Sequence, residues 1–203
     1  MECLAKVARC KTGEPIYCQE DPAHFWYRIV TGAARSCVLL ADGRRQIVDF
    51  LMPGDLFGVG EGQAHLFSVE AIIAETTVAR YPRRRVEVLA ESDVEVGRQL
   101  RETAFNSIMR LQQRMLLLAR TRAIEKVGSF LIEMADRSSP ATENTVALPM
   151  SRYDIADYLA IAVETVSRAL TQLRQRGAIV LDSSRVVRII DRGALQEGCT
   201  VRH

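Results

Sequence analysis

The sequence predicts an α+β protein, with a strand-rich first half, one long helix and a second half built mainly of short helices. Three observations indicate this order. Short apolar runs separated by turn residues fill residues 13–90, a stretch with apolar residues four and three apart covers residues 93–119, and two short helical patterns with a tight break follow at 151–176. The 203 residues, 48% of them hydrophobic, suffice for two small domains.

The first half has the pattern of a β-sandwich or barrel. Asp42-Gly43 stands between two alternating runs and predicts a hairpin, because the turn needs backbone with positive φ. Pro53-Gly54-Asp55 marks a further turn. Many short strands at regular spacing favour a sandwich or barrel. We expect strands at Pro15–Cys18, Trp26–Thr31, Ser36–Leu40, Arg45–Phe50, Val69–Ala74 and Val78–Tyr81.

The long helix carries an apolar stripe. Its alternating spacing of four and three is that of a two-helix coil, which favours a homodimer. A helix packed along its own barrel is the alternative, and the two uses are compatible. Leu100 and Leu117 broaden the stripe. We expect the dimer seam at Ala104, Ile108, Leu111, Met115 and Leu118.

A second helix is expected over Ala123–Ala135, with a polar loop over Asp136–Thr145 and a short strand at Ala147–Met150 after it. Apolar residues recur along this helix at three- and four-residue intervals, which predicts one buried face. The inward residues are expected to be Val127, Phe130, Leu131 and Met134.

Residues 151–176 predict two short helices joined by a tight break. Ser151 and Asp154 have the spacing of a capping box, so the first helix begins there, with Ile155, Ala156 and Leu159 inward. The second, about Val163–Arg176, buries one face. Such a pair is typical of a helix-turn-helix. The inner face is Val166, Ala169, Leu170 and Leu173; the outer face is Glu164, Ser167, Arg168 and Thr171.

The outer face suits the major groove of double-stranded DNA. Arg168 can donate two hydrogen bonds to a guanine, and Glu164 can accept one from a cytosine. Ser167 can contact a base or a phosphate. The alternative for Glu164 and Arg168 is an ordinary ion pair one turn apart, worth ~0.2–0.5 kcal/mol. The flanking helices favour DNA recognition.

A two-stranded wing is expected after this helix. Gly177 suits the left-handed residue that ends a helix. Ile179–Leu181 and Val186–Ile190 flank a short polar turn and predict a β-ribbon. Candidate contacts to the DNA backbone are Thr165, Thr171, Arg185 and Arg188.

Composition excludes several other classes. The net charge of +2 does not by itself predict nucleic-acid binding. We find no signal sequence and no apolar run of about 20 residues, so we expect a cytoplasmic protein without membrane contact. Five widely spaced cysteines fit a reducing compartment. No combination of nucleophile, base and orienting group indicates an enzyme.

The motifs resemble the Crp–Fnr family of transcription regulators, in particular its Fnr and FixK branch. The resemblance rests on Val163-Glu164-Thr165-Val166-Ser167-Arg168, on Asp42–Ile47 and Pro53–Gly58, and on Glu125–Val127 and Phe130-Leu131. It implies a β-roll like that of cyclic-nucleotide-binding domains (a jelly roll), a long dimerisation helix and a winged helix-turn-helix. It also implies that Glu164, Ser167 and Arg168 contact an inverted TTGAT…ATCAA-like repeat, and that RNA polymerase is a partner.

This resemblance divides the chain into a β-roll over 1–92, a dimerisation helix over 93–120 and a DNA-binding domain over 121–203. Two departures stand out. The family usually has Gly in the turn and Ser or Thr before the second helix, where this chain has Ala160 and Ala162. A lost N-cap typically costs ~1 kcal/mol. The family's Gly-Asp is replaced by Glu20-Asp21.

The effector of the β-roll is the open question. Gly58 is followed by Val59, and Ser68–Ala71 contains Glu70 but no Arg, so a cyclic nucleotide is not expected. Cys3, Cys10, Cys18 and Cys37 lack the compact spacing of an iron–sulfur site, and Cys18 is expected in a strand core. We therefore expect no cofactor. The alternative within the family is a haem- or redox-responsive sensor, with His24 and His65 as candidate haem ligands.

Overall fold

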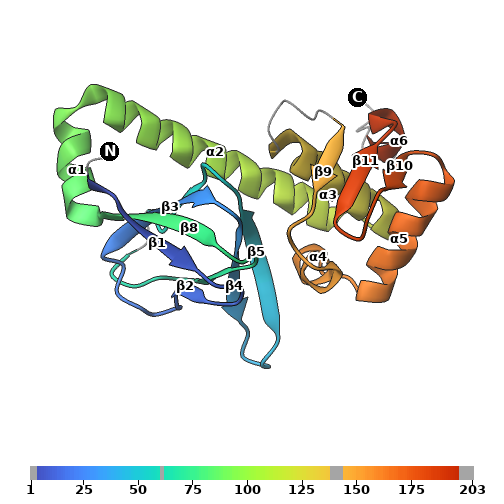
Figure 1. Cartoon of the computed structure of the whole chain (residues 1–203), viewed down its shortest axis with the longest axis horizontal. Coiled ribbons are helices and arrows are strands. Elements are labelled where there is room, and N and C mark those ends of the chain that lie inside the picture. The colour runs from blue at the N-terminus through green and yellow to red at the C-terminus, as the bar shows by residue number, and fades with distance from the viewer. Residues whose placement is uncertain (1–3, 60–61, 138–143, 197–203) are drawn as a thin grey trace. The chain divides into compact units, whose positions relative to one another are not determined.

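The computed structural model describes residues 4–59, 62–137 and 144–196. Its chain divides into two compact units, residues 1–110 and 111–203, and the long helix passes from the first into the second (Figure 1). Within the described residues, no helix is long and apolar enough to cross a membrane.

The described residues of the first unit form two four-stranded antiparallel sheets, which confirms the strand-rich first half. Their strand orders are β1-β8-β3-β6 and β2-β7-β4-β5. Two strands, β1 and β6, were not predicted. The strands are β1 (Lys6–Cys10), β2 (Pro15–Tyr17), β3 (Phe25–Thr31), β4 (Ala34–Leu39), β5 (Arg45–Leu51), β6 (Leu56–Phe57), β7 (Ser68–Ala71) and β8 (Thr76–Pro82).

Apolar residues from both sheets meet in one core, and aromatic rings fill part of it. Tyr17 stacks on His65 with ring centroids 3.7 Å apart, and Tyr27 stacks on Phe57 at 5.4 Å. The prediction for Cys18 is wrong. The β2 strand ends one residue earlier, and the Cys18 N–H donates to the Asp21 carboxylate in an exposed turn.

Two helices follow the sheets: α1 (Arg83–Ser92), which was not predicted, and α2 (Val94–Ala119). Asp93 separates them, because its carboxylate accepts hydrogen bonds from the N–H groups of Glu95 and Val96. Leu100 packs on a cluster around Trp26 and Tyr81 rather than widening the apolar stripe.

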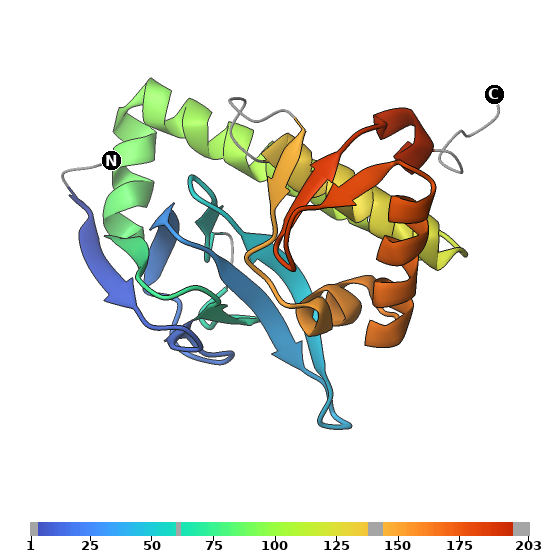
Figure 2. The same ribbon diagram turned by 45° about the vertical axis from the view of Figure 1, so that its right-hand side comes forward.

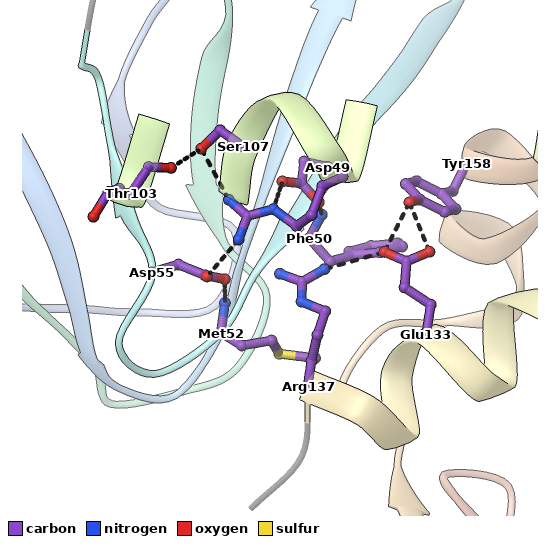
Figure 3. Close-up of polar contacts among 10 residues, drawn as sticks. Asp49, Phe50, Met52, Asp55, Thr103, Ser107, Glu133, Arg137 and Tyr158 are labelled. Atoms are coloured by element: carbon purple, nitrogen blue, oxygen red, sulfur yellow. Dashed lines mark hydrogen bonds and ion pairs between the residues drawn. The ribbon is translucent and has the colours of Figure 1, made fainter. Parts of the chain in front are cut away.

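The α2 helix is also held to the sheets by a polar contact. The Arg110 guanidinium lies 3.3 Å from the Asp55 carboxylate and donates to the Ser107 hydroxyl, one turn back on α2 (Figure 3). Because Asp55 also accepts from the Met52 N–H, this contact ties the helix to the turn that follows β5.

In the described part of the second unit, helices α3 to α6 follow the end of α2, together with a small sheet of strand order β10-β11-β9. Figure 2 shows this unit from a second direction. The predicted inward residues of the first of these helices, such as Phe130 and Leu131, are buried. The predicted strand at 147–150 lies earlier in the chain, because residues 145–147 pair with β11. The elements are α3 (Ala123–Arg137), β9 (Thr145–Ala147), α4 (Arg152–Leu159), α5 (Val163–Gln175), β10 (Ile179–Leu181), β11 (Val186–Ile189) and α6 (Arg192–Gln196).

Candidate nucleic-acid interface

The α4 helix begins at the predicted capping box. The Asp154 N–H donates to the Ser151 hydroxyl at 3.1 Å, and the Ser151 N–H donates to the Asp154 carboxylate at 2.9 Å. Both bonds satisfy N–H groups that lack a partner inside the helix. Ile155, Ala156 and Leu159 are buried, as the spacing predicts.

The turn between α4 and α5 contains Ala160 and Ala162, where the family usually has Gly and Ser or Thr. Ala160 has φ of 52°, in the left-handed region that favours glycine. Its N–H donates to the Ala156 carbonyl and closes the helix. Ala162 is the N-cap of α5 and supplies no side-chain cap. This chain therefore makes the turn with a strained residue and an uncapped second helix.

The α5 helix is amphipathic in the predicted sense. Its inner face, formed by Val166, Ala169, Leu170 and Leu173, is buried. Both Glu164 and Arg168 are exposed, one turn apart, and among the described side chains no ion pair joins them. Thr165, Ser167 and Thr171 are partly exposed.

Neighbouring polar groups orient this outer face. The Arg152 guanidinium of α4 donates to the Ser167 hydroxyl at 3.4 Å. The Thr171 hydroxyl donates back to the Ser167 carbonyl at 3.0 Å, so its oxygen is held against α5. An exposed guanidinium and carboxylate on a rigid helix match the donor and acceptor pattern of a guanine–cytosine pair.

The wing presents two arginines in different states. Both Arg185 and Arg188 are exposed. The Arg188 guanidinium donates to the Asp182 carboxylate at 3.0 Å, and this bond raises the pKa of Arg188. A phosphate must therefore compete with Asp182 for Arg188, whereas Arg185 lies exposed in the turn of the ribbon between β10 and β11.

The predicted seam of α2 is exposed in the single chain. Ala104 is exposed, and the exposed fractions of Ile108, Leu111 and Met115 are 51%, 55% and 71%. Leu118, at 36%, is at the limit of this group. Leu117 is buried, at 5% exposed, so it does not widen the exposed seam in the way that the spacing predicts. The exposed apolar residues missed by the seam pattern are Phe105, Met109 and Leu116.

A cluster of charged side chains forms around Glu70 of β7. It was not predicted from the sequence, because its residues come from separate strands. The Glu70 carboxylate accepts from Arg35 at 2.6 Å and from Arg45 at 3.3 Å. Arg35 comes from β4, which pairs with β7, and Arg45 comes from β5, the next strand beyond β4, so only the folded sheet brings both arginines to Glu70. Any anion bound there must compete with Glu70 for both guanidiniums.

The candidate cofactor ligands are dispersed. His65 is buried against Tyr17, and His24 is exposed. Burial, with a smaller contribution from Glu14, raises the pKa of the Cys10 thiol, which disfavours the thiolate that metals bind. Cys3 lies outside the described residues. In the part of the chain that the structure describes, no three His, Cys, Asp or Glu side chains gather as a metal site would require.

Two family models match the chain. A cyclic nucleotide-binding domain matches residues 7–110, and a Crp-like helix-turn-helix domain matches residues 125–197. Together they span both compact units.

Known proteins agree with these models. The chain is 40% identical to the nitrogen fixation regulation protein FixK of Rhizobium meliloti over 193 residues, which cover 95% of this chain and 87% of that protein. It is 43% identical to FixK of Azorhizobium caulinodans over 184 residues, 89% of this chain and 74% of that protein. Among solved structures, FixK2 from Bradyrhizobium japonicum matches with a TM-score of 0.87 and 42% identity over 95% of this chain and 96% of that one.

Proposed function

Because the chain belongs to the Crp–Fnr family and is a FixK-type transcription regulator with a helix-turn-helix domain, we propose that it binds an inverted TTGAT…ATCAA-like repeat as a homodimer. The observation that carries this proposal is the outer face of α5. There Glu164 and Arg168 are exposed and one turn apart, and in the part of the chain that the structure describes they are not paired with each other. Arg168 would donate to the guanine of each half-site, and Glu164 would accept from the paired cytosine.

The other polar residues of the interface take supporting roles in this proposal. Ser167 would contact a base or phosphate, with Arg152 holding its hydroxyl. Thr165, Thr171 and Arg185 would contact the DNA backbone, which fixes the register of α5 without selecting a sequence. Arg188 would do so only after exchanging Asp182 for a phosphate.

The dimer is supported by the exposed apolar face of α2. The seam residues Ile108, Leu111 and Met115 lie at coiled-coil spacing and are more than half exposed in the single chain. A two-fold dimer presents two α5 helices to one face of the duplex, about one helical turn apart, which matches an inverted repeat.

We further propose that the regulator acts without a resident cofactor. The aromatic core of the β-roll and the Glu70 ion cluster support this. It would work as an activator that contacts RNA polymerase in the cytoplasm. An absorbance spectrum of freshly purified protein checks the first point: we expect protein absorbance alone, and a Soret or iron–sulfur band would contradict it. Titration with cAMP or cGMP should give no heat.

The DNA proposal is tested by binding at fixed salt to three duplexes: the full repeat, the repeat with one half-site scrambled, and a fully scrambled duplex. We expect the full repeat to bind at least about 10³-fold more tightly than the scrambled duplex. The one-half duplex should fall between them. Equal affinity for all three would contradict the proposal.

A further inference from the structure

Two cations meet the carboxyl end of α4. Arg114, near the end of α2, donates from Nη2 to the Tyr158 carbonyl at 3.2 Å. Lys126 of α3 donates from Nζ to the Leu159 carbonyl at 3.4 Å. The last carbonyls of a helix lack partners inside it and lie at the negative end of its dipole, so cations stabilise them. This end of α4 leads directly into the turn before α5.

Arg114 makes a second contact with the same residue. Its guanidinium carbon lies 3.9 Å from the centroid of the Tyr158 ring, which is within the range of a cation–π interaction. The ring is buried and packs against Phe130 at 5.7 Å. On the far side, the Tyr158 hydroxyl donates to Glu133, which pairs with Arg137 (Figure 3).

These contacts join three helices at the Tyr158 side chain. Arg114 comes from α2, Tyr158 from α4 and Glu133 from α3, all within the unit formed by residues 111–203. Arg114 also adjoins Leu111 and Met115 of the exposed apolar face. The surface expected to meet the partner subunit and the helix pair expected to meet DNA are therefore tied together at Arg114.

We propose that Arg114 is a positioning residue that fixes the direction of α2 relative to the helix-turn-helix and so sets the distance between the two half-sites that a dimer recognises. This inference rests on the proposed dimeric DNA binding. Arg114 touches no base in it. It sets where the two α5 helices stand, while Glu164 and Arg168 determine which bases each one prefers.

The test is a panel of duplexes with two identical inverted half-sites whose central gap changes one base pair at a time. Each added pair moves one half-site by about 3.4 Å and about 34° around the helix axis. We expect the unmodified protein to lose at least about tenfold in affinity one base pair from its preferred gap. In Arg114→Gln that loss should shrink to below about threefold. The preference for guanine within each half-site should stay unchanged.

Three further variants separate positioning from general stability. Arg98→Gln is the matched control, because Arg98 pairs with Glu95 and Glu102 on its own helix. It should keep the full gap preference. Tyr158→Phe keeps the ring and carbonyl that Arg114 contacts, and should also keep the preference. Arg114→Lys keeps the positive charge but lacks the planar guanidinium, so it should show an intermediate preference for gap length. It takes the place of Arg114→Gln in the test if Arg114→Gln is unstable.

The outcomes are distinguishable. If the unmodified protein prefers one gap and Arg114→Gln prefers it equally strongly, the positioning role is wrong while the proposed function stands. Equal flattening in Tyr158→Phe and Arg114→Gln would assign the effect to general packing of α4 and would also overturn the inference. If the unmodified protein shows no gap preference at all, the proposed dimeric function fails, and the inference fails with it.

Discussion

The helices α2 and α5 are both amphipathic, but they leave opposite kinds of surface uncovered. The α5 helix buries Val166, Leu170 and Leu173 within its own chain and exposes Glu164 and Arg168. The α2 helix does the reverse over its second half, where large apolar side chains such as Met115 and Leu116 remain exposed.

The difference indicates what each helix can bind. An exposed charged face is stable in water and attracts a polar partner such as DNA. An exposed apolar face of this extent is unfavourable, because burying it gains roughly 25 cal/mol per Å². The α2 face therefore favours a second copy of the chain, and α5 favours a nucleic acid. Variants that alter one helix alone test this division.

The largest effect is expected from Met115→Glu. Near the two-fold axis it would place two like charges against each other in the seam, so the variant should sediment as a monomer. Loss of one half-site contact should lower affinity for the full repeat about 100-fold or more. The control is Val88→Glu on α1, where the native side chain is similarly exposed, at 64% against 71% for Met115. A stable monomer of the unmodified protein at micromolar concentration would contradict the dimer.

A smaller, base-specific effect is expected from Arg168→Ala. It should lose ~1–3 kcal/mol at the guanine and accept other bases there, since a bidentate contact is removed. Binding to single-base variants of the repeat measures this. Arg174→Ala is the control, because Arg174 lies in the last turn of α5 and should leave base preference unchanged. If Arg168→Ala lowers the affinity for every DNA sequence equally, Arg168 supports the fold rather than reading a base.

Glu164→Ala should act in the opposite direction on general affinity. Removing a carboxylate that phosphates repel should raise binding to unrelated DNA a few-fold, while discrimination at the cytosine falls. Titrations with specific and unrelated duplexes at one salt concentration separate the two changes. Glu164→Gln removes the charge but keeps the shape of the side chain, so it should also raise binding to unrelated DNA. A uniform loss on all duplexes would favour a structural role for Glu164.

The smallest effect concerns the turn that joins α4 to α5. Ala160 has positive φ, which costs an L-residue roughly 1–2 kcal/mol. Glycine at this position would remove that strain, but it loses more conformational freedom on folding, which offsets part of the gain. Ala160→Gly should therefore raise the free energy of unfolding by up to about 1 kcal/mol in urea. Ala147→Gly, in strand β9, should lower it instead. A destabilised Ala160→Gly variant would contradict the strained turn.

Local patterns in the sequence predicted these helices well. The capping box at Ser151, the buried face of α5 and the start of α2 at Asp93 each depend on residues within a few positions of one another. Such signals need no knowledge of the rest of the fold.

Features built from distant segments could not be predicted in this way. The β1 strand is mostly exposed and exists through pairing with β8, some 70 residues later, so it shows no apolar alternation. Cys18 was misplaced because a side-chain bond from Asp21 ends the strand. The contact of Arg114 with Tyr158 and the Glu70 cluster likewise join residues that only the fold brings together.

The most direct test of the account is selection of bound DNA from a random pool, performed with the unmodified protein and with Arg168→Ala. We predict that the unmodified protein selects an inverted repeat with a guanine–cytosine pair at a fixed position in each half-site. The variant should select the same repeat with that position relaxed. Selection of a single half-site, of a direct repeat, or of identical sequences by both proteins would contradict recognition of DNA by a dimer through α5.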